Sequence, residues 1–199
     1  LIYLVSLPFA SFVYAAEGGN SLPAALIYPF KWIWGQWFSA AGGYARLSVN
    51  ACNLYTLIGK NWGELGSDPL SIFSWTMLAV SYLLASFRVI SRKKRGRLPL
   101  AGALLMAFLF AFAPMMHERY LFPALILALL AYIRLGDRRI LYYFILASAA
   151  QFLNAAMVLE WGQYTGFEDY GHLQASEQAI NAVVSAVNVV GALFLRWLA

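Results

Sequence analysis

Long uncharged stretches are the feature that most limits what this chain can fold into. They cover residues 1–16, 70–87, 98–116, 120–133, 140–159 and 179–195, and the helix of the third stretch is expected to end near Pro114. A helix needs roughly 20 residues to cross about 30 Å of hydrocarbon, and most of these stretches approach that length. Of all residues, 62% are hydrophobic and only 12% are charged, against about a quarter charged in an average soluble domain. The pattern predicts an all-α fold, a polytopic transmembrane helical bundle of about six spans.

The chain is expected to form a single membrane-embedded domain over residues 1–199, truncated at its N-terminus because Leu1 lies inside an apolar stretch. Cys52 is the single cysteine, so no internal disulfide can form. The segment "WGQYTGFEDYGHLQASEQ" contains Glu168, Asp169 and His172, but a naturally polar loop is weak support for a metal ion. We predict neither a metal nor a cofactor. Glycine-rich nucleotide motifs are missing from the sequence, which argues against a nucleotide-driven pump.

The distribution of charge predicts how the spans are oriented. Alternating spans place ten of the 14 basic residues on one side and eight of the nine acidic residues on the other. Basic residues in short loops collect on the cytoplasmic side. The basic side comprises Arg88, Arg92, Lys93, Lys94, Arg95, Arg97, Arg134, Arg138, Arg139 and Arg196. We therefore read "RKKRGR" as a topology signal rather than a nucleic-acid site, and expect membrane lipids as partners.

Residues 17–68 form the longest segment on the opposite, extracytoplasmic side, and this loop is rich in aromatic residues. Its run "ALIYPFKWIWGQWF" predicts one or two helices lying in the membrane interface, with breaks at Pro29 and Gly35. Asn50 and Asn53 are three residues apart, so on a helix they would share a face and direct two amides into a cleft. Amides and aromatic planes such as Trp62 suit a sugar. Interfacial anchoring with helix capping would leave the same pattern.

The stretch "MMHERYLFP" places His117, Glu118 and Arg119 between two uncharged runs. The run 120–133 is too short to span, so we expect its helix to begin near Met115 or His117, which draws the charges to the edge of the hydrocarbon. Charges there are costly unless they are paired or face water. One interpretation is an ion pair that holds a tight hairpin. The other is an anion site in which Arg119 binds a phosphate while His117 or Glu118 handles a proton or a hydroxyl.

Two segments together carry a resemblance to a known family. "MMHERYLFPAL", preceded about 65 residues upstream by "SVNACNLYTLIGKNW", resembles the C-terminal half of multi-pass membrane glycosyltransferases of the GT-C architecture. The bacterial mannosyltransferase-like proteins related to the GPI mannosyltransferase II family are the group that it resembles. The match covers most of residues 44–130. At Cys52 the chain departs from these relatives, which often have a bulkier aromatic residue there.

This resemblance implies transfer of a sugar, mannose or a similar hexose, from a polyprenyl-phosphate carrier to an acceptor outside the membrane. His117 and Glu118 are then expected to be catalytic: His117 binds a phosphate oxygen or orients the acceptor, and Glu118 fixes Arg119 or His117. Five residues are expected to bind the substrates, namely Asn50, Asn53, Trp62, Arg119 and Tyr120. Such enzymes are similar in taking a catalytic acidic residue, the general base, from the first extracytoplasmic loop, so the present chain alone is expected to lack this base and to be inactive.

Two alternatives from other classes remain. A transporter or flippase of lipid-linked sugars would also use a buried cation and an aromatic cleft, although it more often has helices broken in midspan. A non-catalytic membrane scaffold would need no network of charges. Neither the sugar, the acceptor nor the oligomeric state can be read from the residues.

Overall fold

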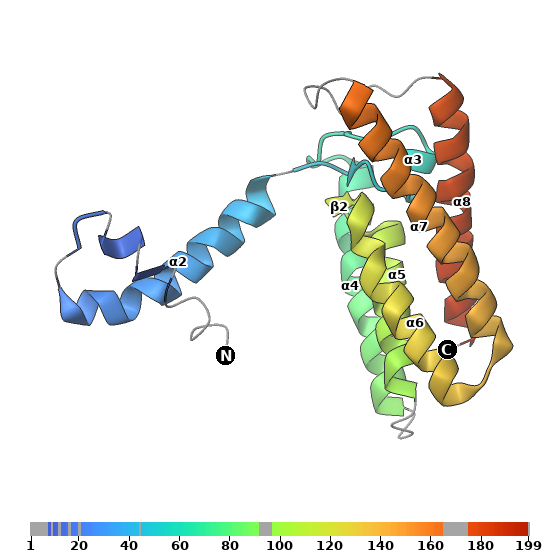
Figure 1. Ribbon diagram of the computed structural model, residues 1–199, viewed down its shortest axis with the longest axis horizontal. Helices are drawn as coiled ribbons and strands as arrows, with labels where there is room; N and C mark the ends of the chain where they lie inside the picture. Colours follow the sequence, from blue (N-terminus) through green and yellow to red (C-terminus); the bar gives the residue numbers. More distant parts are fainter. Residues whose placement is uncertain are drawn as a thin grey trace. The chain divides into compact units, whose positions relative to one another are not determined.

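The computed structural model describes residues 8, 10–11, 13–15, 17–19, 21–43, 45–91, 97–164 and 175–198. They belong to two compact units, Leu1–Ala45 and Arg46–Ala199. Most of the first expected span, most of "RKKRGR" and the trio Glu168, Asp169 and His172 lie outside the described residues. Figure 1 follows the chain from blue to red, and the second unit holds the helices that carry the candidate site.

The first unit contains α2 (Leu22–Gly43), a helix of 22 residues. The breaks predicted at Pro29 and Gly35 are wrong, because α2 runs through both positions. A proline removes one bond of the helix ladder, and the bonds on either side of it are enough to continue the helix. Residues four apart form an exposed apolar stripe on α2, namely Leu26, Phe30, Trp34 and Phe38. An apolar stripe of this kind is what an interfacial helix needs.

The second unit is built around five helices: α4 (Pro69–Ser91), α5 (Leu98–Phe112), α6 (Phe122–Leu135), α7 (Arg138–Tyr164) and α8 (Ala175–Leu198). Three of them are long and apolar enough to cross a membrane, over Pro69–Phe87, Arg138–Gln163 and Gln178–Leu198. α5 and α6 have 15 and 14 residues, which corresponds to only about 22 Å and 21 Å. Among the described residues, three of the expected spans therefore reach membrane-crossing length.

The boundary between α5 and α6 differs from the expectation. α5 ends at Phe112, close to the end expected near Pro114, because Ala113 precedes Pro114 and adopts the extended backbone that this position favours. α6 begins at Phe122, so the expected start near Met115 or His117 is wrong. Pro123 in the first turn suits the new start, since a proline there gives up no needed hydrogen bond.

Helix α5 lies at the centre of the second unit and contacts α4, α6 and α8. Small buried residues line its seam with α6, namely Ala103, Ala107 and Ala111 on α5 and Ala124, Ala128 and Ala131 on α6. A Cβ added at Gly102 would lie 3.0 Å from Leu127 Cδ1. Small residues let helix backbones approach closely where lipid supplies no hydrophobic drive between helices.

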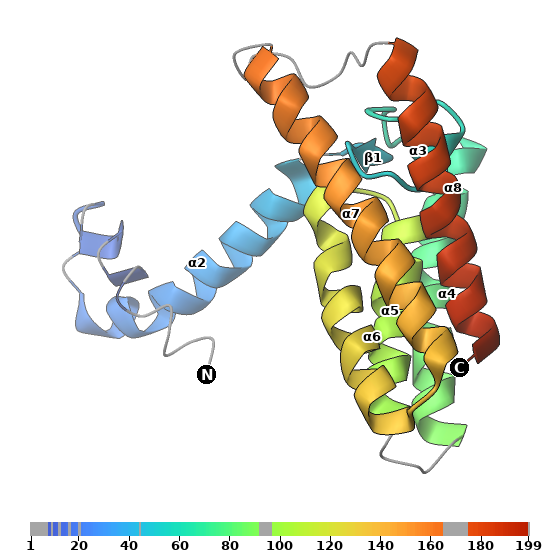
Figure 2. The ribbon, with the colours of Figure 1, turned by 45° about the vertical axis from the view of Figure 1, so that its right-hand side comes forward.

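One end of the bundle carries short elements that join distant parts of the chain. β1 (Ser48–Val49) and β2 (Met116–His117) pair in parallel, with Ser48 opposite Met116 and Val49 opposite His117. They are accompanied by α3 (Leu54–Leu57) and the 3₁₀ helix η2 (Glu118–Leu121). Figures 1 and 2 place β1, β2 and α3 at the end of the bundle away from the α6–α7 turn. The remaining regular structure in the described part of this unit is helical, as the sequence predicts.

Candidate functional site

Two segments meet at this end of the bundle, residues 46–64 and 113–121, which we call the polar platform. Besides the parallel pairing, Met115 N donates to Arg46 O at 3.0 Å, and Asn50 forms a bridge with His117. The pairing joins positions nearly 70 residues apart in the sequence. The predicted amide residue Asn50 and the predicted catalytic residue His117 are therefore neighbours in the fold.

Glu118 lies between His117 and Arg119. Its Oε1 accepts from Arg119 Nη1 at 2.9 Å, and its Oε2 is 3.9 Å from His117 Nδ1. The Glu118 side chain is only 17% exposed, whereas the Arg119 side chain is 60% exposed. Tyr120 completes the cluster: its ring meets the His117 ring edge-on at 5.1 Å and lies 5.7 Å from the Arg119 guanidinium carbon. Glu118 and Tyr120 thus contact one side of the Arg119 guanidinium, and its other side is exposed.

The environment of His117 favours its neutral form. Burial lowers the pKa of the imidazole below its ordinary value, and the positive charge of Arg119 lowers it further, while Glu118 acts in the opposite direction. At neutral pH the ring therefore has one nitrogen that donates and one that accepts a hydrogen bond. A neutral imidazole can hold or orient a hydroxyl group without adding charge to a partly buried site.

Asn50 and Asn53 do not share a helix face, so that expectation is wrong. Asn50 ends the extended segment with φ at +57°, and its Oδ1 accepts from Trp62 Nε1 at 2.8 Å and from Asn61 Nδ2 at 3.0 Å. Asn53 is the N-cap of α3, where its Oδ1 accepts from Tyr55 N and Thr56 N. Asparagine bonds readily to nearby backbone and tolerates positive φ, which favours caps and turns over helix interiors.

The structure adds four amide side chains that the sequence reasoning did not select: Gln151 and Asn154 on α7, and Asn181 and Asn188 on α8. All are buried and all bind the polar platform. Asn154 Oδ1 accepts from Cys52 N at 2.9 Å and Asn154 Nδ2 donates to Asn50 O at 2.8 Å. Asn188 Nδ2 donates to Cys52 O at 2.9 Å, and Gln151 Nε2 donates to Glu118 O at 2.6 Å. We call these four residues the amide set.

The amide set holds the platform deep along α8. Asn188 lies ten residues before the end of the helix, about 15 Å along its axis. Irregular backbone at such a depth in a membrane is tolerated only where protein buries it or where it lines a polar cavity. Three buried atoms of this region have no partner among the described residues, namely Asn53 Nδ2, Gln151 Oε1 and Asn188 Oδ1. Amide groups beyond those used by the fold are therefore available for further hydrogen bonds.

Cys52 is a structural residue of this arrangement. Its Sγ lies 3.0 Å from Asn181 Oδ1, and the residue is 1% exposed. Burial raises the pKa of the thiol to about 12, with the Ser185 hydroxyl opposing that shift. The thiol is thus protonated at neutral pH, which excludes a nucleophilic role because the thiolate is the reactive form.

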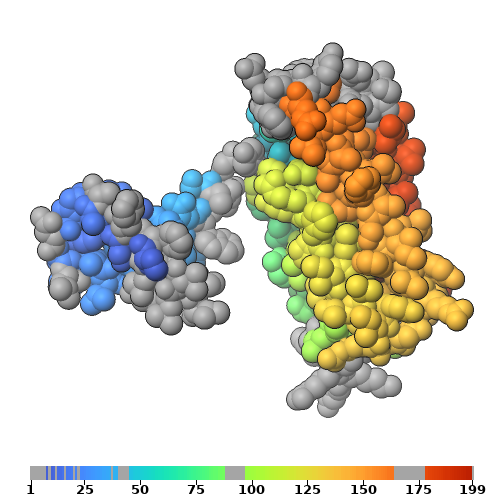
Figure 3. Space-filling model, in the orientation of Figure 1, coloured from blue at the N-terminus to red at the C-terminus, as the bar shows by residue number. Residues whose placement is uncertain are grey.

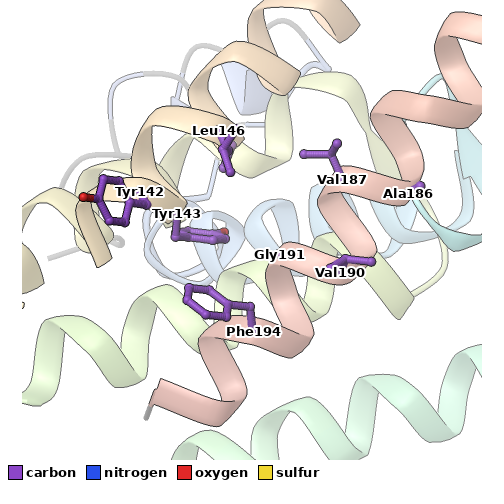
Figure 4. A pocket seen from close by; sticks show the side chains of 9 residues that line it. Tyr142, Tyr143, Leu146, Ala186, Val187, Val190, Gly191 and Phe194 are labelled. Carbon is purple, nitrogen blue, oxygen red and sulfur yellow. The ribbon is translucent and has the colours of Figure 1, made fainter. Parts of the chain in front are cut away.

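Two apolar grooves run along the helix seams, each of about 460–470 Å³. One lies between α6 and α7 and includes Phe122 and Gln151, so it reaches the platform. The other lies between α7 and α8 near Tyr143, Gly191 and Phe194 (Figure 4). No cluster of three potential metal ligands occurs within the described ranges of the chain.

No protein-family model, curated protein or solved structure matches the chain. The fold itself defines a class: a helical bundle whose three long apolar helices are consistent with a membrane protein.

Proposed function

We propose that the protein is an integral-membrane glycosyltransferase that moves a sugar from a polyprenyl-phosphate carrier to an extracytoplasmic acceptor. The observation that carries the proposal is the Glu118–Arg119 pair, in which a partly buried carboxylate orients a largely exposed guanidinium at the platform. A planar guanidinium held in this way suits two phosphate oxygens. The resemblance of "HERY" to the GT-C architecture points to the same chemistry.

The proposal completes the topology with six spans and places the polar platform on the extracytoplasmic side. The basic residues of the α6–α7 turn support this orientation, since Arg134, Arg138 and Arg139 lie at the opposite end of the bundle from "HERY". α5 and α6 are short, so the platform is recessed below the ends of α7 and α8. A lipid-linked phosphate then arrives at the depth of Arg119.

In the proposed reaction an acceptor hydroxyl attacks the anomeric carbon of the sugar while the bond from that carbon to the phosphate oxygen breaks. The bonding electrons go to the leaving phosphate, and Arg119 stabilises the negative charge that develops there. Neutral His117 holds a phosphate oxygen or the acceptor hydroxyl. The hydroxyl proton goes to a carboxylate base, which the GT-C resemblance places in an upstream loop. Asn50 and Trp62 form the wall nearest the sugar, and Asn53, which is fully buried, supports that wall as the cap of α3.

The test is transfer of labelled sugar from polyprenyl-phosphate mannose and polyprenyl-phosphate glucose, in membranes that contain the complete parent chain. Arg119→Ala is expected to reduce transfer by about 100-fold or more, as loss of a group that stabilises developing charge does. Arg139→Ala is the matched control, because Arg139 also pairs with a carboxylate, Asp137 at 2.7 Å, and stacks on Trp197 at 5.3 Å. It lies at the other end of the bundle and should leave transfer unchanged.

Equal transfer by wild type and Arg119→Ala would mean that the Glu118–Arg119 pair stabilises the fold and takes no part in transfer. No transfer by the wild type would favour the transporter or scaffold alternatives. A transporter would instead move the lipid-linked sugar across vesicle membranes in a manner that depends on Arg119, and a scaffold would tolerate Arg119→Ala in every assay.

A further inference from the structure

The groove between α6 and α7 continues directly from the polar platform. Figure 3 shows these two helices side by side, in yellow and orange. The groove holds about 460 Å³, and its walls are apolar apart from Ser148 and Gln151. It extends along α6 from Phe122 to Leu130, about 12 Å on the helix axis. In a membrane this surface faces hydrocarbon, so the groove suits a hydrocarbon chain.

The end of the groove is tied to the candidate anion site by two contacts. Phe122, which lines the groove, follows Arg119 by three residues in the chain. Gln151, which also lines the groove, donates to the backbone carbonyl of Glu118 at 2.6 Å. A molecule with an anionic head at Arg119 would therefore have its chain at the start of the groove.

We infer that this groove binds the first part of the hydrocarbon chain of a single-chain polyprenyl phosphate whose phosphate lies at Arg119. The inference rests on the proposed function and adds a determinant of carrier specificity. One groove of this volume accepts one chain, so a two-chain phospholipid leaves its second chain outside. Because the chain leaves the hydrocarbon of the bilayer for the groove, the gain comes from close packing rather than from removal of water, so affinity should rise with chain length only until the groove is filled.

The groove between α7 and α8 provides an internal control. Its volume is nearly the same, about 470 Å³, but Figure 4 shows that its walls come from Tyr143 and Leu146 on α7 and from Val190 and Phe194 on α8. These residues lie in the half of the bundle away from the platform. Ala186 lines this groove and Ala155 lines the α6–α7 groove, and both alanines are half-buried on their helices. Substituting phenylalanine at either position fills one groove and spares the other.

The experiment measures binding of polyprenyl phosphates of increasing chain length to the full chain in lipid nanodiscs. Ala155→Phe is expected to weaken binding by about tenfold or more, because the added ring overfills the groove, and to shorten the chain length at which affinity levels off. Ala186→Phe should bind within about twofold of wild type. If Ala155→Phe does not fold, Ser148→Leu fills the same groove.

Equal binding by Ala155→Phe and Ala186→Phe would overturn the groove assignment. If Arg119→Ala still bound more weakly than the wild type, the phosphate site at Arg119 would be retained. Phosphatidic acid bound as tightly as polyprenyl phosphate would overturn the single-chain specificity and make the groove a general phospholipid site. No binding of any polyprenyl phosphate to the wild type would overturn both the groove assignment and the proposed function.

Discussion

Asn154 makes the most informative perturbation of the fold, because one side chain satisfies two buried peptide groups of the polar platform. Its amide accepts from Cys52 N and donates to Asn50 O, at 2.9 Å and 2.8 Å. Asn154→Leu keeps the branched shape and the number of side-chain heavy atoms, so it opens no cavity and removes these bonds. Each buried peptide group left unsatisfied costs about 1–3 kcal/mol, so we expect a loss of about 3 kcal/mol in the free energy of unfolding.

The assay is reversible unfolding in detergent micelles or bicelles, with Leu153→Ala as the control on the neighbouring, exposed position of α7. The control should change stability by less than about 1 kcal/mol. A loss below about 1 kcal/mol in Asn154→Leu would refute the reasoning, since the peptide groups would then have found other partners. Asn188→Leu releases the carbonyl of Cys52, so the double variant should lose clearly less than the two single losses added.

Two further predictions concern the platform. Because the pKa of His117 is lowered in the folded protein, its stabilising contribution is complete above the unfolded value of about 6.5 and is lost as pH falls from that value through the lower folded pKa. Thermal unfolding between about pH 5 and 7 should therefore show stability rising with pH, and His117→Gln should flatten that rise; an unchanged slope would contradict the assigned burial. Asn53→Ala should cost about 1 kcal/mol of stability by removing the cap of α3, while Asn53→Ser retains most of it; equal losses in the two variants would argue against capping.

The long helices follow from the sequence because uncharged length is a local property. Residues 70–87, 140–159 and 179–195 predict α4, α7 and α8 without knowledge of what surrounds them. Residues 98–116 predict the start of α5 and an end near Pro114, because a proline interrupts the bonds of a helix. The run 120–133 does not predict that α6 begins only at Phe122, because Met116 pairs with Ser48, and that partner lies far away in the chain.

The polar platform was harder to predict because the residues that decide its conformation also lie far apart in the sequence. The spacing of Asn50 and Asn53 fits a helix face, but capping of α3 and the bonds of Trp62 and Asn61 decide their conformations. A usable signal was nevertheless present. Gln151 and Asn154, three residues apart inside an apolar stretch, share a helix face, and polar side chains inside a membrane span need partners. Reading that face as a docking surface for loop backbone would have brought α7 to the site.

The bonds from the amide set to Cys52 also set an order of assembly. They join residues separated by 102, 129 and 136 positions, and two of the three come from α8, which follows α4 to α7 in the chain. The ribosome delivers residues 46–64 long before their partners exist, so their peptide groups must stay hydrated until α7 and α8 have been made. Only the arrival of α8 allows the segment to dock. Substitutions in α8 should therefore act first on maturation, with an undocked, protease-sensitive loop as the intermediate that accumulates.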